Sequence, residues 1–400
     1  MPTSAYIHIP FCRRRCFYCD FPISVIGNRK RGETSNTIGT YVDWLCKEIR
    51  TTPPLGPMLK TVFFGGGTPS LLSVSQLEQI LHVLNQHFGI ATDAEISMEM
   101  DPGTFDLAHL QEYCSLGINR ISLGVQAFND ILLEKCGRFH RLVDVYRAVD
   151  YVHRSQVSSW SLDLISGLPG QTLKTWQDGL KSAIATNPHH ISVYDLTIEP
   201  QTPFGKQYQP GKHPLPSEIA TVDMYRLTQQ ILTDTGYEHY EISNYAKVGH
   251  QCRHNRTYWE NRPFYGFGMG ATSYTQAKRV ARPRTQQTYR QWVEHYQQAG
   301  GILDDPEVSN LEQLTDRLMV GLRLAEGIEL APFIQTFGNG FTTMLNIRLK
   351  PYLLSGQAIL KNNCLRLSDP GGFLISNTIL VAIFNGIEQL IGDQKLTTKT

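Results

Sequence analysis

The first half of the chain alternates short apolar runs, rich in strand-forming residues, with segments of helical periodicity. Six strand candidates are present, and they span residues 5–9, 61–65, 95–100, 120–126, 160–167 and 191–198. Between them, apolar residues recur at helical spacing, as in Leu77, Ile80, Leu81 and Leu84. Six repeats of a strand followed by a helix predict a parallel sheet with helices outside it, either open or closed into a barrel.

The pattern changes in the second half. A helix is predicted from Ser217, as N-cap, to Gly236, as C-cap, and "YEHYEIS" then indicates one more strand. From about Ala281 come a helix over 311–328, helical stretches at 331–337 and 342–356, and a hairpin-like segment from 358. We therefore expect an α/β protein with a partial (β/α)6 barrel at 1–245, a connecting segment at 246–280 and a smaller C-terminal α+β domain, similar to a winged helix, at 281–400.

Charge and composition exclude several classes of protein. The net charge is +1 and the C-terminal segment has no basic stripe, so we expect packing and no nucleic-acid binding from this domain. No apolar run approaches the roughly 20 residues of a membrane span, and "MPTSAYIHIP" lacks the apolar core of a signal peptide. A cytoplasmic protein is predicted, whose eight cysteines are reduced and serve as metal ligands or buried thiols. The polar stretch at 25–36 predicts a solvated loop.

Three cysteines are crowded into the loop that follows the first predicted strand: Cys12, Cys16 and Cys19. Ligands of parallel βα sheets bind at the carboxyl ends of the strands, where this loop lies. Three thiolates can hold three irons of a [4Fe–4S] cluster and leave the fourth iron open to another ligand. A zinc site with His8 as fourth ligand is the alternative, although the Cys-x3-Cys-x2-Cys spacing favours the cluster.

Polar residues and glycines follow several other strands. "GGGTPS" (65–70) comes directly after the second strand, where glycines let a ligand approach the backbone or simply turn the chain. Glu99, Gln126 and Asp163 lie at or near strand ends, and Arg138 follows in "KCGRFH". Such groups are either satisfied by internal hydrogen bonds or contact a ligand.

Taken together, these motifs resemble the radical S-adenosylmethionine (SAM) superfamily, in its coproporphyrinogen-oxidase-like branch. The resemblance runs from Tyr6 to about residue 380, with every motif in the family's order. It implies a [4Fe–4S] cluster on the three cysteines and SAM as cofactor. The cofactor contacts that it implies are Tyr6, Tyr18, Gly66, Gly67, Thr68, Glu99, Gln126, Arg138 and Asp163.

Two members of this branch differ in biochemical class. One is oxygen-independent coproporphyrinogen III oxidase, a radical decarboxylase of haem synthesis, and the other is a haem-binding chaperone. The oxidase carries an additional cysteine two positions after the third, where this chain has Phe21, and a long extension before the loop, where only eleven residues precede Cys12. Both departures favour the chaperone, so we expect no oxidase activity and assign no catalytic residue.

The stretch "HNRTYW" (254–259) adds to this expectation, because it resembles a motif that such chaperones carry and that is associated with haem. His254 can ligate iron, while Tyr258 and Trp259 offer flat apolar surface to a porphyrin. The alternative is a packed aromatic turn with a hydrogen-bonded histidine. The resemblance implies haem as cargo and apo-haem proteins, respiratory ones by analogy, as acceptors. It leaves a homodimer and peripheral membrane contact open.

Overall fold

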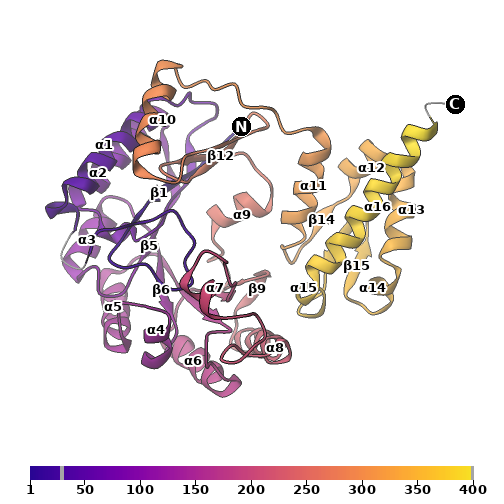
Figure 1. Cartoon of the computed structure of the whole chain (residues 1–400), viewed down its shortest axis with the longest axis horizontal. Helices are drawn as coiled ribbons and strands as arrows, with labels where there is room; N and C mark the ends of the chain where they lie inside the picture. Colours follow the sequence, from indigo (N-terminus) through magenta and orange to yellow (C-terminus); the bar gives the residue numbers. More distant parts are fainter. Residues whose placement is uncertain (28–30, 398–400) are drawn as a thin grey trace.

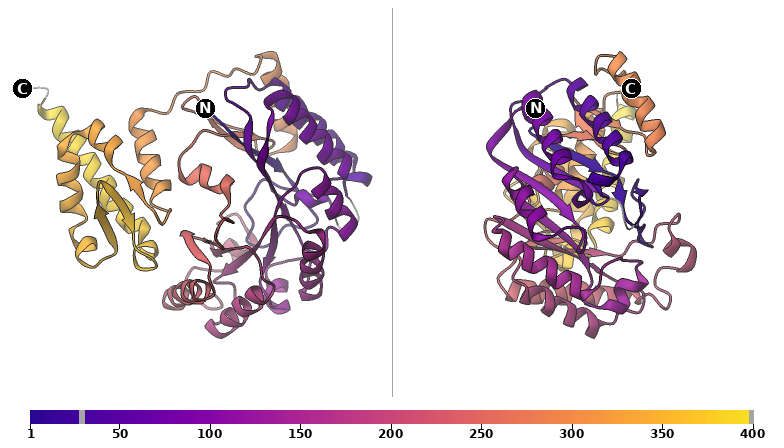
Figure 2. Two further views of the ribbon diagram at one scale, coloured as in Figure 1. Left: turned by 180° about the vertical axis from the view of Figure 1, so that it is seen from behind. Right: turned by 90° about the vertical axis from the view of Figure 1, so that its left-hand side faces the viewer.

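The chain forms a large α/β unit and a smaller C-terminal unit that lie side by side (Figures 1 and 2). The computed structural model describes residues 1–27 and 31–397, with side chains up to residue 391. Residues 28–30 of the predicted loop at 25–36 therefore lie outside the described residues. No helix in the described ranges is long and apolar enough to cross a membrane.

The large unit is built on one curved sheet. Within the described residues the sheet has nine strands, in the order β11 (Tyr265–Phe267), β1 (Ser4–Ile9), β4 (Leu59–Gly66), β5 (Ile90–Met100), β6 (Arg120–Gln126), β7 (Ser159–Ser166), β8 (His190–Asp195), β10 (Asn244–Ala246) and β9 (Glu238–Glu241). The strands from β1 through β8 pair in parallel, and β9 and β10 are antiparallel. In this order β9 and β11 are opposite edges, so the predicted partial (β/α)6 barrel is confirmed and is open.

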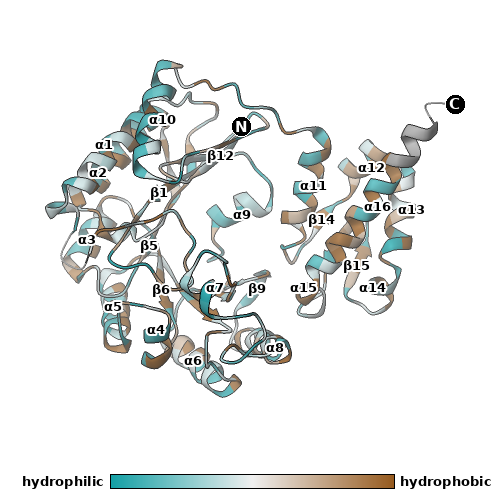
Figure 3. Ribbon diagram, in the orientation of Figure 1, coloured by the Kyte–Doolittle hydropathy of each residue, from teal (hydrophilic) through white to brown (hydrophobic). Residues whose placement is uncertain are grey.

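Helices cover the outer face of this sheet. They are α1 (Asn36–Thr51), α2 (Val74–Phe88), α3 (Leu107–Ser115), α4 (Asp130–Lys135), α5 (Leu142–Ser155), α6 (Leu173–Ala185) and α8 (Glu218–Asp234). The short helix α7 (Pro203–Gln207) lies instead beside the loop that carries the three cysteines, where the Phe204 N–H donates to Phe17 O at 3.0 Å. Ser73 caps α2 by accepting a hydrogen bond from the Gln76 N–H, and the apolar face predicted for this helix is buried. Hydrophilic residues lie on the outer helices and hydrophobic ones along strands such as β6 (Figure 3).

Some boundaries differ from the sequence prediction. The strand expected at 191–198 ends at Asp195, after which the Leu196 N–H bonds to Ser166 O in a loop. The strand predicted from "YEHYEIS" ends as β9 at Glu241. The chain then turns back, and β10 pairs with β9 in antiparallel fashion at the sheet edge. The predicted N-cap of α8 agrees with the structure, because Ser217 accepts from the Ala220 N–H. The C-cap is Thr235, one residue before the predicted Gly236, which follows with a positive φ of 90°.

The segment after β10 returns to the barrel. It contains α9 (Arg253–Trp259), β11, the hairpin β12 (Thr272–Thr275) and β13 (Lys278–Ala281), and α10 (Gln286–Gln298). Glu48 of α1 is fully buried and holds this segment in place: it pairs with Arg282 and accepts hydrogen bonds from Tyr289 Oη and the Gly268 N–H. We therefore propose that α10 belongs to the barrel unit, which would move the expected boundary at 281 to the stretch before residue 310.

The C-terminal unit has a hydrophobic core of its own, which includes Leu318, Phe333 and Phe341. Its elements are α11 (Asn310–Gly321), β14 (Ile328–Glu329), α12 (Ala331–Phe337), α13 (Asn339–Arg348), α14 (Lys350–Leu354), β15 (Ala358–Lys361), β16 (Cys364–Leu367), α15 (Gly371–Leu374) and α16 (Ser376–Thr397). The helix predicted at 311–328 ends at Gly321, and the stretch 342–356 divides before Pro351. The predicted hairpin is present as β15 and β16.

Candidate functional site

The cysteine loop lies at the carboxyl end of β1. The first of its cysteines, Cys12, lies in β2 (Phe11–Cys12), a two-residue strand that pairs with β3 (Ser24–Val25). Cys12, Cys16 and Cys19 are free thiols of intermediate exposure. Burial raises the pKa of Cys12 to about 12, so its thiol keeps its proton until a bound metal displaces it. Three soft thiol donors on one short loop are the donor set of an iron–sulfur cluster.

Two donors reach the sulfurs from other loops, Thr68 from the turn after β4 and Arg138 from the loop between α4 and α5. Thr68 Oγ1 lies 3.6 Å from Cys12 Sγ, and Arg138 Nη1 lies 3.4 Å from Cys16 Sγ. Asp101, just beyond β5, orients both donors, because it accepts from Thr68 Oγ1 at 3.2 Å and pairs with Arg138 Nη2. The sequence prediction included Thr68 and Arg138 but missed Asp101, although "MEMDP" puts a second acid two residues after Glu99.

The glycine run after β4 allows close packing that another residue would block. Gly66 has φ +105°, and a Cβ on it would lie 2.3 Å from the His8 ring. A Cβ on Gly67 would lie 2.8 Å from the carbonyl oxygens of Ile9 and Phe11. The glycines therefore hold the β4 turn directly against the cysteine loop.

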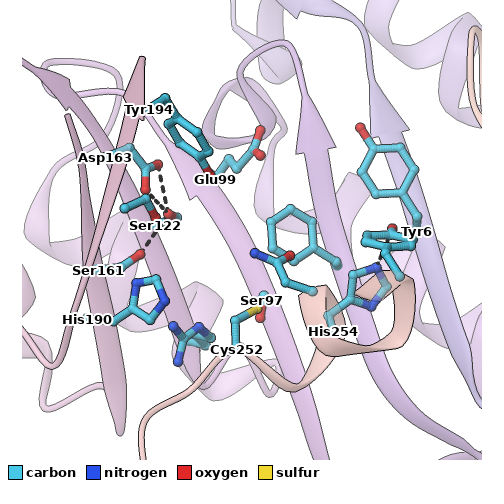
Figure 4. Close-up of a pocket in the computed structure, with 15 residues that line it drawn as sticks. Tyr6, Ser97, Glu99, Ser122, Ser161, Asp163, His190, Tyr194, Cys252 and His254 are labelled. Atoms are coloured by element: carbon cyan, nitrogen blue, oxygen red, sulfur yellow. Dashed lines mark hydrogen bonds between the residues drawn. The ribbon is translucent and has the colours of Figure 1, made fainter. Parts of the chain in front are cut away.

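Glu99 and Asp163 line a cavity of about 180 Å³ inside the barrel (Figure 4). The Glu99 carboxyl accepts the Gly66 N–H at 3.0 Å. Burial and the charge of Asp163 raise the pKa of Glu99 to about 8. Burial also raises the pKa of Asp163 to about 6, although Ser122 Oγ donates toward its two oxygens at 2.9 and 2.8 Å. Ser122 is a further residue that the sequence prediction missed.

The remaining predicted contacts are divided between the cavity and its surroundings. Tyr6 lines the cavity, and its hydroxyl lies 3.0 Å from His8 Nδ1. Gln126 ends β6 with a positive φ of 67° next to the Arg138 guanidinium, and both approach Gly124. Tyr18 packs outside the cavity, with its ring 6.4 Å from that of Phe204.

The zinc alternative finds no support in this arrangement. The ring nitrogens of His8 are both engaged, Nδ1 by Tyr6 and Nε2 by Pro22 O at 3.1 Å. Across residues 1–27 and 31–397, no three His, Cys, Asp or Glu side chains converge as ligands of one metal ion. A cluster has no such requirement, because each thiolate binds a different iron.

The helix α9 closes the opposite end of the cavity from Glu99 (Figure 4). Glu95 caps this helix by accepting the N–H groups of Arg253 and His254, each at 3.0 Å. His254 is fully buried: Nδ1 lies 2.8 Å from Thr61 Oγ1, Nε2 lies 2.8 Å from the Tyr258 hydroxyl, and the ring stacks on Phe63. Burial lowers the pKa of His254 to about 3, so the imidazole is neutral.

The three motif residues thus face two environments. His254 and Tyr258 are one helical turn apart and line the barrel cavity. Trp259 is half-buried and faces the C-terminal unit, where the Arg323 guanidinium lies 5.4 Å from its ring. Its indole Nε1 has no hydrogen-bond partner among the described residues.

Comparisons with known proteins agree with this geometry. Residues 6–183 match the Radical SAM superfamily, and residues 308–374 match the HemN C-terminal domain. The solved structure of coproporphyrinogen III oxidase (HemN) from Escherichia coli superimposes with a TM-score of 0.81 over 96% of this chain and 90% of that one, at 24% identity. The barrel, the cysteine loop and these matches define a radical SAM protein, a family that implies a [4Fe–4S] cluster and SAM. The predicted fold class and superfamily are confirmed.

Within this class the chain belongs to the HemW family. It is 48% identical over 407 residues to a protein named heme chaperone HemW from Synechocystis, covering 97% of this chain and 98% of that one. A protein of the same name from Bacillus subtilis is 36% identical over 87% of this chain and 90% of its own length.

Proposed function

We propose that this protein is a haem chaperone that binds haem and delivers it to apo-haem proteins, and that it carries a [4Fe–4S] cluster and SAM. The observation that carries the proposal is the 48% identity, over nearly the whole chain, with a protein named heme chaperone HemW. Phe21 in place of the oxidase's additional cysteine and the "HNRTYW" helix support the same conclusion. We further propose a cytoplasmic location and respiratory haem proteins as acceptors.

In this proposal Cys12, Cys16 and Cys19 hold the cluster. When bound, the cluster would supply one electron for the reductive cleavage of the SAM sulfonium. The hydrogen bonds from Arg138 and Thr68 would stabilise the negative charge of the ligating sulfurs. The remaining predicted contacts, from Tyr6 to Asp163, serve SAM: the glycines admit it close to the backbone, and the carboxyl groups of Glu99 and Asp163 accept its N–H and O–H groups.

We propose that the "HNRTYW" helix contacts haem through Trp259 and is supported from inside by His254. Both nitrogens of His254 are hydrogen-bonded, so ligation of iron by this residue would require those bonds to break. Trp259 offers a flat apolar ring, and the adjacent Arg323 offers a cation for a porphyrin carboxylate.

The test is a haem titration followed by transfer. Wild type should give a saturable Soret shift and pass haem to apomyoglobin, and Trp259→Ala should weaken binding at least about tenfold, a hot-spot effect. Trp44→Ala is the matched control, because Trp44 is also half-buried and lies beneath cations, with Lys47 Nζ 4.2 Å from its ring. His250→Ala and Cys252→Ser test nonspecific binding. If Trp259→Ala binds haem with wild-type affinity, Trp259 is not part of the haem site. If the wild-type protein shows no specific haem binding, the chaperone proposal is refuted.

A further inference from the structure

Among the described residues, one buried arginine of the barrel forms no ion pair with a carboxylate. In the described part of the chain three arginines are more than nine-tenths buried: Arg120 and Arg282 are each 4% exposed and Arg138 is 8% exposed. Arg282 pairs with Glu48 and Arg138 with Asp101. Arg120 lies within ion-pair distance of no described acid. Because a buried charge is costly unless it is paired, Arg120 is the exception that needs a partner.

The surroundings of Arg120 satisfy only part of its guanidinium. Its Nη1 donates to Ser159 Oγ at 3.0 Å and to His250 O at 2.9 Å. No other described group accepts a hydrogen bond from Arg120, although the fork carries five N–H donors. The side chain lines the barrel cavity, near its α9 end, so the remaining donors are available to an occupant.

Two more polar groups of this cavity lack partners. Ser97 Oγ and His190 Nδ1 are unpaired within the described residues, and each of these side chains is 2% exposed. His190 Nε2 lies 2.9 Å from the Tyr240 hydroxyl, which also accepts the Cys252 N–H at 3.3 Å. Burial lowers the pKa of His190, so the imidazole is neutral and carries its one proton on either ring nitrogen. In the tautomer protonated at Nδ1, His190 presents an unpaired donor to an occupant of the cavity.

The nearby acids hydrogen-bond to other groups. Asp163 lines the same cavity, and the charge of Arg120 opposes the burial that raises its pKa, but its two oxygens share the proton of the Ser122 hydroxyl and form no direct ion pair with Arg120. Glu95 accepts two backbone N–H groups of α9. Glu99 lies at the far end of the cavity and accepts the Gly66 N–H. At the α9 end of the cavity, Arg120 therefore presents guanidinium N–H donors that no described carboxylate engages directly.

We propose that Arg120, Ser97 and His190 form a carboxylate-binding subsite at the α9 end of the barrel cavity. A carboxylate supplies two acceptor oxygens to a guanidinium fork and removes the unpaired charge. The whole cavity measures about 180 Å³, which admits a small monocarboxylate or one carboxylate arm of a larger molecule. The carboxylate can thus come from a separate small acid or from a propionate arm of haem. The haem source rests on the proposed function.

The test compares propionate with propionamide, which has nearly the same shape and no charge. Saturation-transfer NMR on the full-length reconstituted protein should show saturable propionate binding and much weaker propionamide binding. Arg120→Gln should weaken propionate binding at least about tenfold and Ser97→Ala several-fold, because each removes donors to a charged ligand. Arg154→Gln on α5, which is exposed and pairs with Asp150, is the matched control and should bind as wild type does.

Three results would overturn the subsite: no saturable propionate binding by wild type, equal binding of propionamide, or unchanged propionate binding in Arg120→Gln. Should Arg120→Gln fail to fold, Ser97→Ala and the amide comparison decide the question, because unchanged binding in Ser97→Ala or equal amide binding is then sufficient to reject it.

Haem and haem dimethyl ester distinguish the two sources of the carboxylate. If the subsite takes a propionate arm, the ester binds more weakly than haem and free propionate competes with haem. If it takes a separate small acid, haem and its ester bind equally and propionate binds beside them. A protein that binds propionate but no haem would refute the chaperone proposal and leave the subsite standing.

Discussion

Replacing His254 by alanine should destabilise the barrel even when no ligand is bound. The change removes hydrogen bonds of 2.8 Å to Thr61 and to Tyr258, each worth about 1 kcal/mol, from a fully buried site. It also removes the stack on Phe63, worth about 0.5–1.5 kcal/mol. The expected loss is about 3 kcal/mol. With an unfolding entropy of about 2.1 cal/mol/K per residue, this lowers the Tm of a unit of roughly 300 residues by about 5 °C.

Urea denaturation followed by circular dichroism, together with the Tm, measures this loss. Tyr258→Phe removes only one of the two hydrogen bonds and should cost about 1 kcal/mol. An unchanged urea midpoint in His254→Ala would refute the structural role assigned to the imidazole. The result also decides how haem titrations are interpreted, because weaker haem binding by an unstable His254→Ala variant would not identify an axial ligand.

Three further predictions concern the cofactor end of the barrel. Cys→Ser at Cys12, Cys16 or Cys19 should abolish the roughly four irons per chain expected on anaerobic reconstitution, and full iron loading of the triple variant would contradict the cluster assignment. Because the pKa of Glu99 is raised from 4.5 to about 8, its ionisation destabilises the ligand-free fold as pH rises through this window. The free energy of unfolding of Glu99→Gln should therefore increase relative to wild type between about pH 5 and 9, and a constant difference would show that Glu99 titrates normally. Gly66→Ala should lower the Tm by many degrees, since its Cβ would meet the His8 ring, whereas Gly179→Ala, with nothing within 4 Å, should not; equal Tm values would contradict the packing argument.

The sequence predicted the features that depend on local patterns. Strand positions followed from short apolar runs, α2 followed from helical spacing, and α8 followed from its N-cap Ser217. The carboxyl ends of parallel strands share one edge, so the sequence predicts that the cysteine loop, the glycine run and Glu99 lie near one another. The structure places them there, with Gly66 bonded to Glu99.

Features that depend on contacts between distant residues were not predictable. The sequence around His254 is the same whether the imidazole binds iron or packs in the core. Its hydrogen-bond partner Thr61 lies 193 positions away in the sequence. Asp101 acquires its role only when Arg138 folds against it. The lack of a carboxylate partner for Arg120 among the described residues can be recognised only in the structure, which gives the positions of the neighbouring acids.

We predict that this protein handles haem without decarboxylating coproporphyrinogen III. The most direct measurement supplies the anaerobically reconstituted protein with SAM, a reductant and coproporphyrinogen III, and follows protoporphyrinogen IX by chromatography after oxidation. We predict no turnover above a control in which Cys12, Cys16 and Cys19 are serine, in the same preparation that transfers haem to apomyoglobin. Conversion at enzymatic rates would identify the protein as a coproporphyrinogen III oxidase and contradict the prediction that it handles haem without this activity.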